Sequence, residues 1–306
     1  MKNRKLILVG AGPGDPSLIT LKGVEALKQA DAILYDALVH PDLLNYAKEN
    51  AVKIFVGKRA GEHSMKQDEI NQLIVETAFM YGNVVRLKGG DPFIFGRGYE
   101  ELDFVRKFGL ETEVIPGVSS STGLTALQQI PLTTRGMNDG FWVITGSTSE
   151  EKLSEDLKVA AQTNATVVIL MGYKKLAQIA AIYQLLGKSN LPIAVIQNGS
   201  FENEKIAIGT IDTILDETKK RNLGTPAIIV IGEVVKLHPS FQKEIAAVKI
   251  FKIKQEELQQ TKWISKKDWS IRSGLPEPPG ILPIEHLAKL RFRRAIRSYM
   301  KKRASK

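Results

Sequence analysis

The stretch that decides the fold is a glycine-rich segment between two regular patterns, and it reads Leu87-Lys88-Gly89-Gly90-Asp91-Pro92-Phe93-Ile94-Phe95-Gly96-Arg97-Gly98-Tyr99-Glu100-Glu101. It follows an apolar run, 84–87, and leads into an amphipathic stretch, 99–108, so it lies where a strand passes into a helix. Four glycines within ten residues exceed what a plain turn needs. Because glycine lets the backbone approach a ligand closely, the segment predicts a ligand-binding loop.

Outward from this segment, short apolar runs alternate with helical periodicity. The first series predicts strands at 6–9, 32–35, 53–56, 84–87 and 113–115, with helices at 17–29, 67–81 and 99–108. A stretch without periodicity, 130–140, carries Pro and Gly and predicts an interdomain connection. The second series predicts strands at 141–145, 166–170, 193–197, 205–208 and 227–231, with helices at 151–162, 175–186 and 211–221.

This alternation predicts the α/β class, with two α/β domains, 1–130 and 138–244, and a cleft between them. The length of 306 residues agrees, at roughly 150 residues per domain. After residue 244 the pattern changes to a proline-interrupted extension, 245–306, with an amphipathic helix expected at about 284–303.

The net charge of +10 has an uneven distribution along the chain. The extension 245–306 holds 16 Lys and Arg against 5 Asp and Glu, a net of +11, which leaves 27 basic and 28 acidic residues, a net of −1, in 1–244. The body is therefore neutral, and an attraction to nucleic acid or to a membrane surface concerns the extension alone. The favoured interpretation of the extension is a solvated appendage that packs weakly on the body or on a dimer partner.

Composition excludes several kinds of chemistry. The chain has no cysteine, which excludes disulfides, thiolate metal sites and cysteine nucleophiles. The apolar run 6–9 near the N-terminus is too short for a signal peptide, and no run approaches the roughly 20 residues that span a bilayer. A cytoplasmic location is expected.

A second glycine-rich loop opens the chain at Val9-Gly10-Ala11-Gly12-Pro13-Gly14-Asp15-Pro16. A dinucleotide-binding fingerprint is one interpretation, but Asp15 stands where its third glycine belongs, Pro13 removes an N–H, and an acidic side chain repels a pyrophosphate. A tight turn without a ligand is another interpretation.

Further motifs accompany these loops in order: Tyr35-Asp36, Val56-Gly57-Lys58-Arg59-Ala60-Gly61, Val114-Ile115-Pro116-Gly117-Val118-Ser119 and Pro131-Leu132-Thr133. Together they resemble the tetrapyrrole (cobalamin/sirohaem-type) methyltransferases over about residues 5–240. Within that family the match is closest to the enzymes that act on uroporphyrinogen III.

The resemblance implies an S-adenosylmethionine-dependent C-methyltransferase that works as a homodimer and binds its cofactor between two α/β domains. It implies the transfer of two methyl groups to uroporphyrinogen III to give precorrin-2, for sirohaem or cobalamin biosynthesis. Two alternatives within the superfamily are a later corrin precursor and ribosomal RNA as substrate. A third, from another class, is a non-enzymatic module that docks through its basic helix.

The resemblance also implies a set of cofactor contacts. They are Pro13, Gly89, Gly90, Asp91, Ile94, Ser119, Ser120, Met171, Gly199 and Ala227. The family commonly has Thr-Ala at positions 119 and 120, but small residues still permit close approach. Met171 has a plain core position as its alternative. A sulfonium cofactor brings its own electrophile, so no metal site is expected, and neither His40 nor His63 has a ligand-spaced partner.

In similar enzymes Asp36 corresponds to the proton acceptor and Lys58 to the proton donor. The alternatives are that Asp36 caps a helix and that Lys58 is a solvated surface charge. The substrate carries eight carboxylates, which arginine binds with a bidentate fork. The candidates are Arg59, Arg97 and Arg135 in the motif loops, and Arg97 has as its alternative a structural pair with Glu100 or Glu101.

The motif begins within the first ten residues, so the sequence predicts a methyltransferase without a preceding dehydrogenase and chelatase domain. We expect removal of residues 245–306 to leave methyl transfer largely intact, because every motif lies in the neutral body. Assay of the truncated chain, with sedimentation to measure its assembly, tests this. Loss of activity or of a soluble dimer would contradict the expectation.

Overall fold

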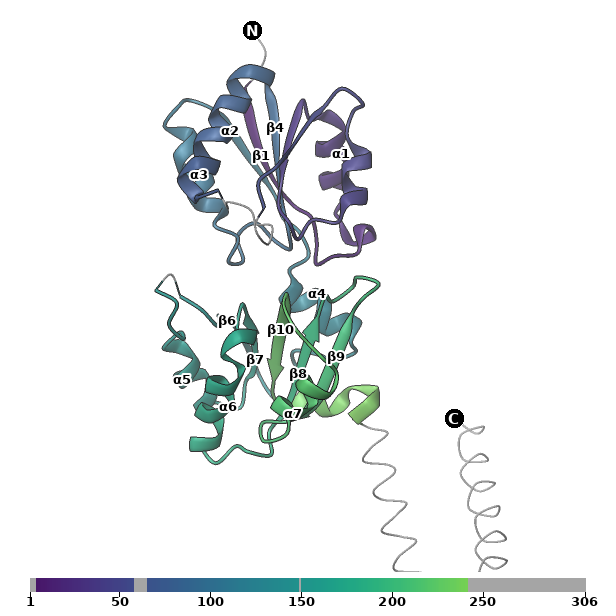
Figure 1. Cartoon of the computed structure of the whole chain (residues 1–306), viewed down its shortest axis with the longest axis vertical. Helices are drawn as coiled ribbons and strands as arrows, with labels where there is room; N and C mark the ends of the chain where they lie inside the picture. Colours follow the sequence, from purple (N-terminus) through teal and green to yellow (C-terminus); the bar gives the residue numbers. More distant parts are fainter. Residues whose placement is uncertain (1–3, 58–64, 149, 242–306) are drawn as a thin grey trace, which may run out of the picture. The chain divides into compact units, whose positions relative to one another are not determined.

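The computed structural model describes residues 4–57, 65–148 and 150–241, and it contains two five-stranded sheets (Figure 1). Both sheets belong to one compact unit, Met1–Glu244. The predicted α/β class is confirmed, while the division into domains 1–130 and 138–244 stays a prediction. Lys58, Arg59 and the extension with its predicted helix at 284–303 lie outside the described residues.

The first sheet is wholly parallel, in the order β3-β2-β4-β1-β5. Because parallel strands all end at the same edge, Gly10, Asp36 and Lys88 follow or close their strands at one edge of the sheet. This is the edge at which open α/β sheets bind ligands. The strands are β1 (Lys5–Gly10), β2 (Ala32–Tyr35), β3 (Val52–Phe55), β4 (Asn83–Lys88) and β5 (Glu111–Ile115).

Helices cover both faces of this sheet (Figure 1). Helix α1 (Leu21–Gln29) lies on one face, while α2 (Gln67–Tyr81) and α3 (Gly98–Arg106) lie on the other. Successive residues of β1 point to opposite faces, so Leu6 and Leu8 pack in the core under α2 and α3 while Ile7 and Val9 pack under α1. This double burial explains why the strands are apolar runs without alternation.

Helix α1 starts four residues later than its periodicity predicts. A short 3₁₀ helix, Pro16–Leu18, precedes it, and the Thr20 hydroxyl then caps α1 by accepting a hydrogen bond from Gly23 N at 3.1 Å. A second 3₁₀ helix, Pro41–Tyr46, begins after His40. Asp36 therefore caps no helix, and that alternative for Asp36 is wrong.

The second sheet is mixed, in the order β6-β7-β10-β8-β9. Only β6 and β7 run parallel, while β10 lies antiparallel between β7 and β8. The apolar runs predicted each of these strands but not their order or direction. They are β6 (Phe141–Thr145), β7 (Thr166–Leu170), β8 (Pro192–Gln197), β9 (Lys205–Thr210) and β10 (Ala227–Ile231).

One face of the second sheet is covered by α5 (Asp156–Gln162), α6 (Leu176–Leu185) and α7 (Ile214–Lys220). Its other face packs against the 3₁₀ helix Glu233–Leu237 and against α4 (Ser120–Leu127), a helix that the sequence pattern did not predict. Helix α4 is rich in Ser, Thr and Gly and has no apolar stripe, yet its Leu124 is buried in the core of this face. A remaining 3₁₀ turn, Tyr173–Lys175, leads into α6.

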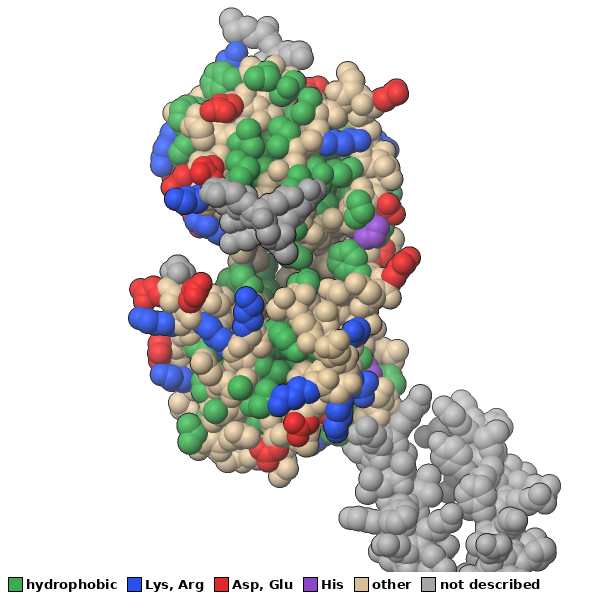
Figure 2. Space-filling model, in the orientation of Figure 1, with side chains coloured by type: hydrophobic (Ala, Val, Ile, Leu, Met, Phe, Trp, Pro, Cys, Tyr) green, Lys and Arg blue, Asp and Glu red, His purple; other side chains and the backbone are tan. Residues whose placement is uncertain are grey.

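The surface of the described part carries both charge signs, as the neutral body predicts. Figure 2 shows basic and acidic side chains intermingled on the face in view. None of the helices in the described residues has the length and apolarity that crossing a bilayer requires.

Three glycines from three different loops touch backbone to backbone at the ligand-binding edge of the first sheet. A Cβ atom on Gly10 would lie 2.5 Å from Gly117 Cα and 2.7 Å from Gly90 O. A Cβ atom on Gly117 would lie 2.6 Å from Gly10 Cα. Real Cβ atoms essentially never approach backbone so closely, so only glycine lets the loops after β1, β4 and β5 meet.

We expect Gly117→Ala to destabilise the fold by about 1–3 kcal/mol or more, because the new methyl group meets fixed backbone rather than a movable side chain. The shift of the urea denaturation midpoint measures this. Gly140→Ala is the matched control, since its Cβ meets nothing within 4 Å and its backbone lies outside the left-handed region. Equal midpoints for the two variants would contradict the close-packing account.

Candidate functional site

A pocket of about 1180 Å³ lies within the compact unit and draws its walls from both sheets. Its lining includes the loops that follow β1, β2 and β4 and the start of α4. From the second sheet it includes the ends of β7 and β8 and the start of β10. Pockets for small ligands are commonly about 300–1,000 Å³, so this one has room for a large ligand or for two.

The pocket brings together most of the predicted site residues. Arg97 and Asp36 line it, whereas the exposed Arg135 is not among its lining residues. The positions of Lys58 and Arg59 lie outside the described residues. Every predicted cofactor contact lines the pocket: Pro13, Gly89, Gly90, Asp91, Ile94, Ser119, Ser120, Met171, Gly199 and Ala227.

Backbone hydrogen bonds join the two glycine-rich loops. Gly90 N donates to Gly12 O at 2.7 Å, and Gly12 N donates to Gly90 O at 3.2 Å. The Asp91 carboxylate accepts from Phe93 N at 2.8 Å and from Gly117 N at 3.0 Å, so it also joins the loop after β4 to the loop after β5. The loops are thereby fixed before any ligand binds.

The same bonds argue against a dinucleotide site at the opening loop. A pyrophosphate needs free backbone N–H groups, but Gly12 N is committed to Gly90 and Asp15 N donates to Ser200 Oγ at 2.9 Å. The Asp15 carboxylate accepts from Ser17 N at 2.8 Å, and this bonding lowers the pKa of Asp15. The loop therefore keeps a negative charge where a pyrophosphate would have to lie.

The pocket wall near the second sheet depends on small residues. A Cβ atom on Gly199 would lie 2.6 Å from the side-chain methyl groups of Leu124 on α4, so a larger residue here would displace that side chain. Ser119 caps α4, accepting from Ser121 N at 3.3 Å, and its hydroxyl also lies 2.9 Å from Ser121 Oγ. The Ser119 hydroxyl is thus engaged within the helix start, and Ser120 follows it at the pocket wall.

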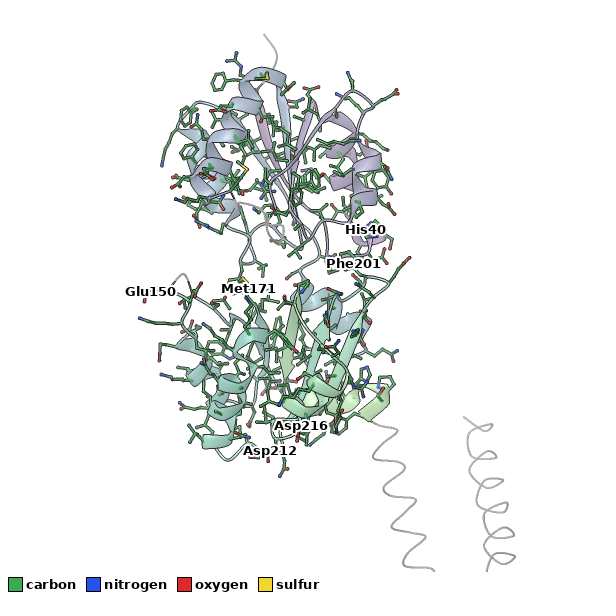
Figure 3. All side chains as sticks on the ribbon, in the orientation of Figure 1. His40, Glu150, Met171, Phe201, Asp212 and Asp216 are labelled. Atoms are coloured by element: carbon green, nitrogen blue, oxygen red, sulfur yellow. The ribbon has the colours of Figure 1, made fainter. Side chains whose placement is uncertain are left out.

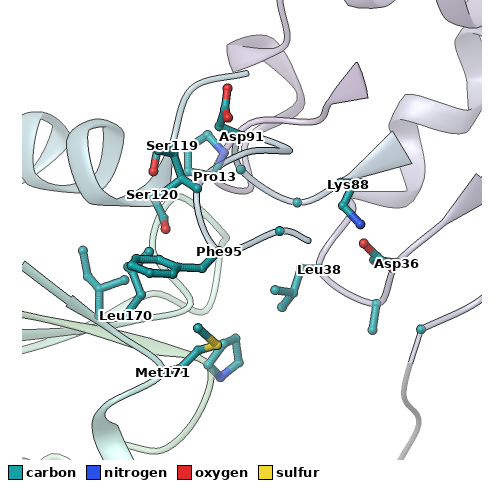
Figure 4. A pocket seen from close by; sticks show the side chains of 18 of the residues that line it. Pro13, Asp36, Leu38, Lys88, Asp91, Phe95, Ser119, Ser120, Leu170 and Met171 are labelled. Carbon is teal, nitrogen blue, oxygen red and sulfur yellow. The ribbon is translucent and has the colours of Figure 1, made fainter. Parts of the chain in front are cut away.

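Apolar side chains exposed to solvent converge in the pocket (Figure 4). Leu38, Ile94, Phe95 and Met171 line it, and each has an exposed fraction between 42 and 55%. A core position for Met171 is therefore wrong. Phe95 and Met171 also have left-handed φ angles, 54° and 57°, which non-glycine residues keep only where the surrounding structure enforces them. Such strain and apolar exposure are typical of a binding site.

Four charged side chains interact at the pocket wall, and all of them except the part-exposed Asp36 are buried. The Asp36 carboxylate accepts from Arg86 Nη2 at 2.6 Å. Glu101, which is fully buried, accepts on Oε1 from Arg86 Nε at 3.2 Å and from Lys88 Nζ at 2.9 Å. Gln67 Nε2 donates to the same oxygen at 3.1 Å. Figure 4 shows the Lys88 amine and the Asp36 carboxylate pointing toward each other.

The pKa values of the two cations of this set shift in opposite directions. Burial disfavours a charged Arg86, but the neighbouring Glu101 and Asp36 charges outweigh it and raise the pKa of Arg86. Burial, followed by the positive charge of Arg86, lowers the pKa of Lys88, and Glu101 and Asp36 oppose that shift only in part. Of the two cations, Lys88 is therefore the one that loses its proton more readily.

Arg97 forms a bidentate ion pair with Glu100 at the start of α3. Nε donates to Oε1 at 2.9 Å and Nη2 donates to Oε2 at 2.6 Å, and this bonding raises the pKa of Arg97. The structural alternative for Arg97 is confirmed with Glu100 as its partner, although Arg97 also lines the pocket. The pair is half exposed, so a stronger anion could displace Glu100.

One side of the pocket is closed by contacts between the loops of the two sheets. The rings of His40 and Phe201 stack with centroids 5.7 Å apart, and Figure 3 shows them side by side. Phe201 itself lines the pocket. The bond from Asp15 N to Ser200 Oγ reinforces the same contact.

Arg86, Lys88 and Glu101 are site residues that were not predicted from the sequence. A signal was present, since Arg86 interrupts the apolar run of β4 and Lys88 stands directly before Gly89-Gly90. A charged residue in a strand buried on both faces requires a buried partner. The sequence could therefore have flagged the two cations but not their shared anion on α3.

The donor set of the pocket fits an adenosyl sulfonium cofactor. Glycine backbone, apolar side chains and the start of α4 can receive a nucleoside, and Asp36 is an anion on the pocket wall. No group of three or more His, Asp or Glu side chains in the described ranges is arranged to hold a metal ion.

Comparisons with known sequences agree with this site. The family model for tetrapyrrole (corrin/porphyrin) methylases matches residues 5–215. The uroporphyrinogen-III C-methyltransferase of Methanocaldococcus jannaschii is 45% identical over 235 residues, which are 76% of this chain and 96% of that protein. A sirohaem synthase of Actinobacillus pleuropneumoniae is 46% identical over 240 residues; these are 78% of this chain but only 48% of that longer protein.

Solved structures of tetrapyrrole methyltransferases have the same fold as this chain. The uroporphyrin-III C-methyltransferase of Thermus thermophilus, complexed with S-adenosylhomocysteine, is 37% identical with a TM-score of 0.66, covering 76% of this chain and 99% of its own. A cobalt-precorrin-4 methyltransferase is 26% identical with a TM-score of 0.68, covering 76% and 96%. The chain therefore belongs to the tetrapyrrole methylases, the family that its motifs resemble.

Proposed function

We propose that this protein is a uroporphyrinogen-III C-methyltransferase that transfers two methyl groups from S-adenosylmethionine to its substrate and forms precorrin-2. The observation that carries the proposal is the convergence of all ten predicted cofactor contacts on one pocket of about 1180 Å³. Relatives of that activity at 45% and 37% identity support it. The product serves sirohaem or cobalamin biosynthesis.

The bound cofactor supplies an electrophilic methyl group on a sulfonium, so the chain's own contribution is binding, orientation and proton transfer. The joined loops at Gly12 and Gly90, with the start of α4, hold the nucleoside end. The apolar side chains of Phe95 and Met171 receive the flat faces of the ligands. Because these loops are fixed in advance by backbone bonds, little ordering is needed when the reactants meet.

In this mechanism the Asp36 carboxylate accepts the proton that leaves the methylated substrate, and Lys58 is the proton donor. Asp36 suits its role because it lines the pocket while Arg86 fixes its orientation at 2.6 Å. Arg59, Arg97 and Arg135 are the proposed arginine contacts for substrate carboxylates. Of these, Arg97 lines the pocket.

A homodimeric assembly and a cytoplasmic location are part of the proposal, and no metal takes part in it. A second candidate substrate is a later corrin precursor, which the 26% identical cobalt-precorrin-4 methyltransferase of TM-score 0.68 favours. Ribosomal RNA, or docking of the basic extension on nucleic acid or a membrane, has support only from the charge of residues 245–306.

We expect anaerobic incubation with uroporphyrinogen III and S-adenosylmethionine to give products heavier by one and then by two methyl groups. Mass spectrometry of the products measures this, with a boiled sample as control. Binding of S-adenosylmethionine without methylation of uroporphyrinogen III would overturn the substrate assignment and leave the fold intact. Methylation of cobalt-precorrin substrates alone would favour the second candidate.

We expect Asp36→Asn to lower kcat by about 10²–10⁴-fold, the usual contribution of a positioned acid or base, because an amide cannot accept the proton. Steady-state kinetics between pH 6 and 9 measure this. Asp103→Asn is the control: Asp103 lies on α3 and forms an exposed ion pair with Lys107, which follows the helix. Turnover unchanged across this pH range would remove Asp36 from the role of base.

A further inference from the structure

Lys88 is a buried cation on the pocket wall that the proposed function does not use. Only 5% of the residue is exposed, although it is among the lining residues of the pocket. It lies at the last position of β4, so its backbone is fixed by the central strand of the first sheet. A buried lysine at such a place costs free energy unless a partner repays it.

The partners of Lys88 leave part of its ammonium group unused. An ammonium has three N–H donors, and in the described residues Lys88 has one acceptor, Glu101 Oε1 at 2.9 Å. The same oxygen also accepts from Arg86 and Gln67, so three donors share it. Glu101 Oε2 is buried without a partner in the described residues, so the carboxylate is held through one oxygen.

The neighbouring anion, Asp36, is held by Arg86. Its carboxylate accepts from Arg86 Nη2 at 2.6 Å, a charge-assisted hydrogen bond. Lys88 lines the pocket, so a ligand bound there can bring an acceptor within reach of its ammonium group. An anionic oxygen from a ligand would complete the ammonium group.

We propose that Lys88 binds a carboxylate of the substrate, and that Glu101 is the positioning residue that holds the ammonium group in place. The inference rests on the proposed function, because the proposed substrate carries eight carboxylates. It adds a cation held on the central strand to the arginines of the loops. Lysine suits this place because its ammonium group can donate to a carboxylate in several directions, unlike the planar fork of arginine.

The first test measures binding of uroporphyrin III, the oxidised and unreactive form of the proposed substrate, by equilibrium dialysis. Lys88→Met keeps an unbranched side chain that is one atom shorter and removes its charge. We expect binding to weaken by about 10–100-fold, as for the loss of one charged hydrogen bond, and KM for uroporphyrinogen III to rise in step. The dissociation constant of S-adenosylmethionine should stay within about twofold, because the inference assigns Lys88 to the substrate and not to the cofactor.

Two further variants keep the test sharp. Lys107→Met removes an exposed lysine of the segment after α3 and should leave uroporphyrin binding unchanged. If the single variant fails to fold, the double variant Lys88→Met/Glu101→Met takes its place. It removes one cation and one anion, so the remaining charges of Asp36 and Arg86 still balance. It should show the same weakened binding as Lys88→Met.

A pH series tests the positioning role of Glu101. The groups that act on Lys88 are Arg86 on the same strand, Asp36 after β2, and Glu101 and Glu100 on α3. Only the ammonium form binds a carboxylate, so affinity falls as the pH rises through the pKa of Lys88, which burial holds below its ordinary value. In Glu101→Gln a negative charge that raises this pKa is lost, so the fall should begin at lower pH than in the wild type.

The outcomes separate the inference from the proposed function. Unchanged uroporphyrin binding in Lys88→Met, or a fall in kcat alone with KM constant, would overturn the inference. An unshifted pH dependence in Glu101→Gln would overturn the positioning role of Glu101. Failure of the wild type to methylate uroporphyrinogen III would overturn the proposed function instead, and Lys88-dependent binding of uroporphyrin would still support this cation as a carboxylate site.

Discussion

The contact on which the site depends is the backbone-to-backbone packing of Gly10, Gly90 and Gly117. It lets the loops after β1, β4 and β5 meet at one edge of the first sheet, where a Cβ atom on Gly10 would lie 2.5 Å from Gly117 Cα. Reciprocal bonds between Gly12 and Gly90 then lock the loops. The backbone of these loops therefore fixes the shape of the pocket, and side chains supply the surface that a ligand contacts.

The pocket is lined by an apolar surface and by a charged surface. Phe95 and Met171 offer exposed apolar area, while Asp36 and Lys88 are set on a buried ionic framework. Inside a protein, charges interact more strongly than in water, so the order of this framework has a large effect on the field in the pocket. A flat macrocycle with acidic substituents matches both surfaces.

Sequence reasoning could predict the site where function depends on backbone or on an ordered motif. The family resemblance carried by residues 87–101 and the accompanying motifs implied ten cofactor contacts, and all ten residues line one pocket. It could not predict the insertion of β10 between β7 and β8, because strand order depends on pairing over long distances. Nor could it predict α4, whose burial comes from Leu124 rather than from an apolar stripe, or the choice of Glu101 as the shared anion.

The formal charges of Asp36, Arg86, Lys88 and Glu101 balance to zero, and all of these side chains except Asp36 are buried. Removing a single member leaves its partner buried and uncompensated, at a cost of about 3–5 kcal/mol. Descendants of this chain are thus expected to exchange these residues in oppositely charged pairs or not at all. The charged residues of the pocket wall would then change only by rare paired substitutions, while the surrounding loops accept single substitutions.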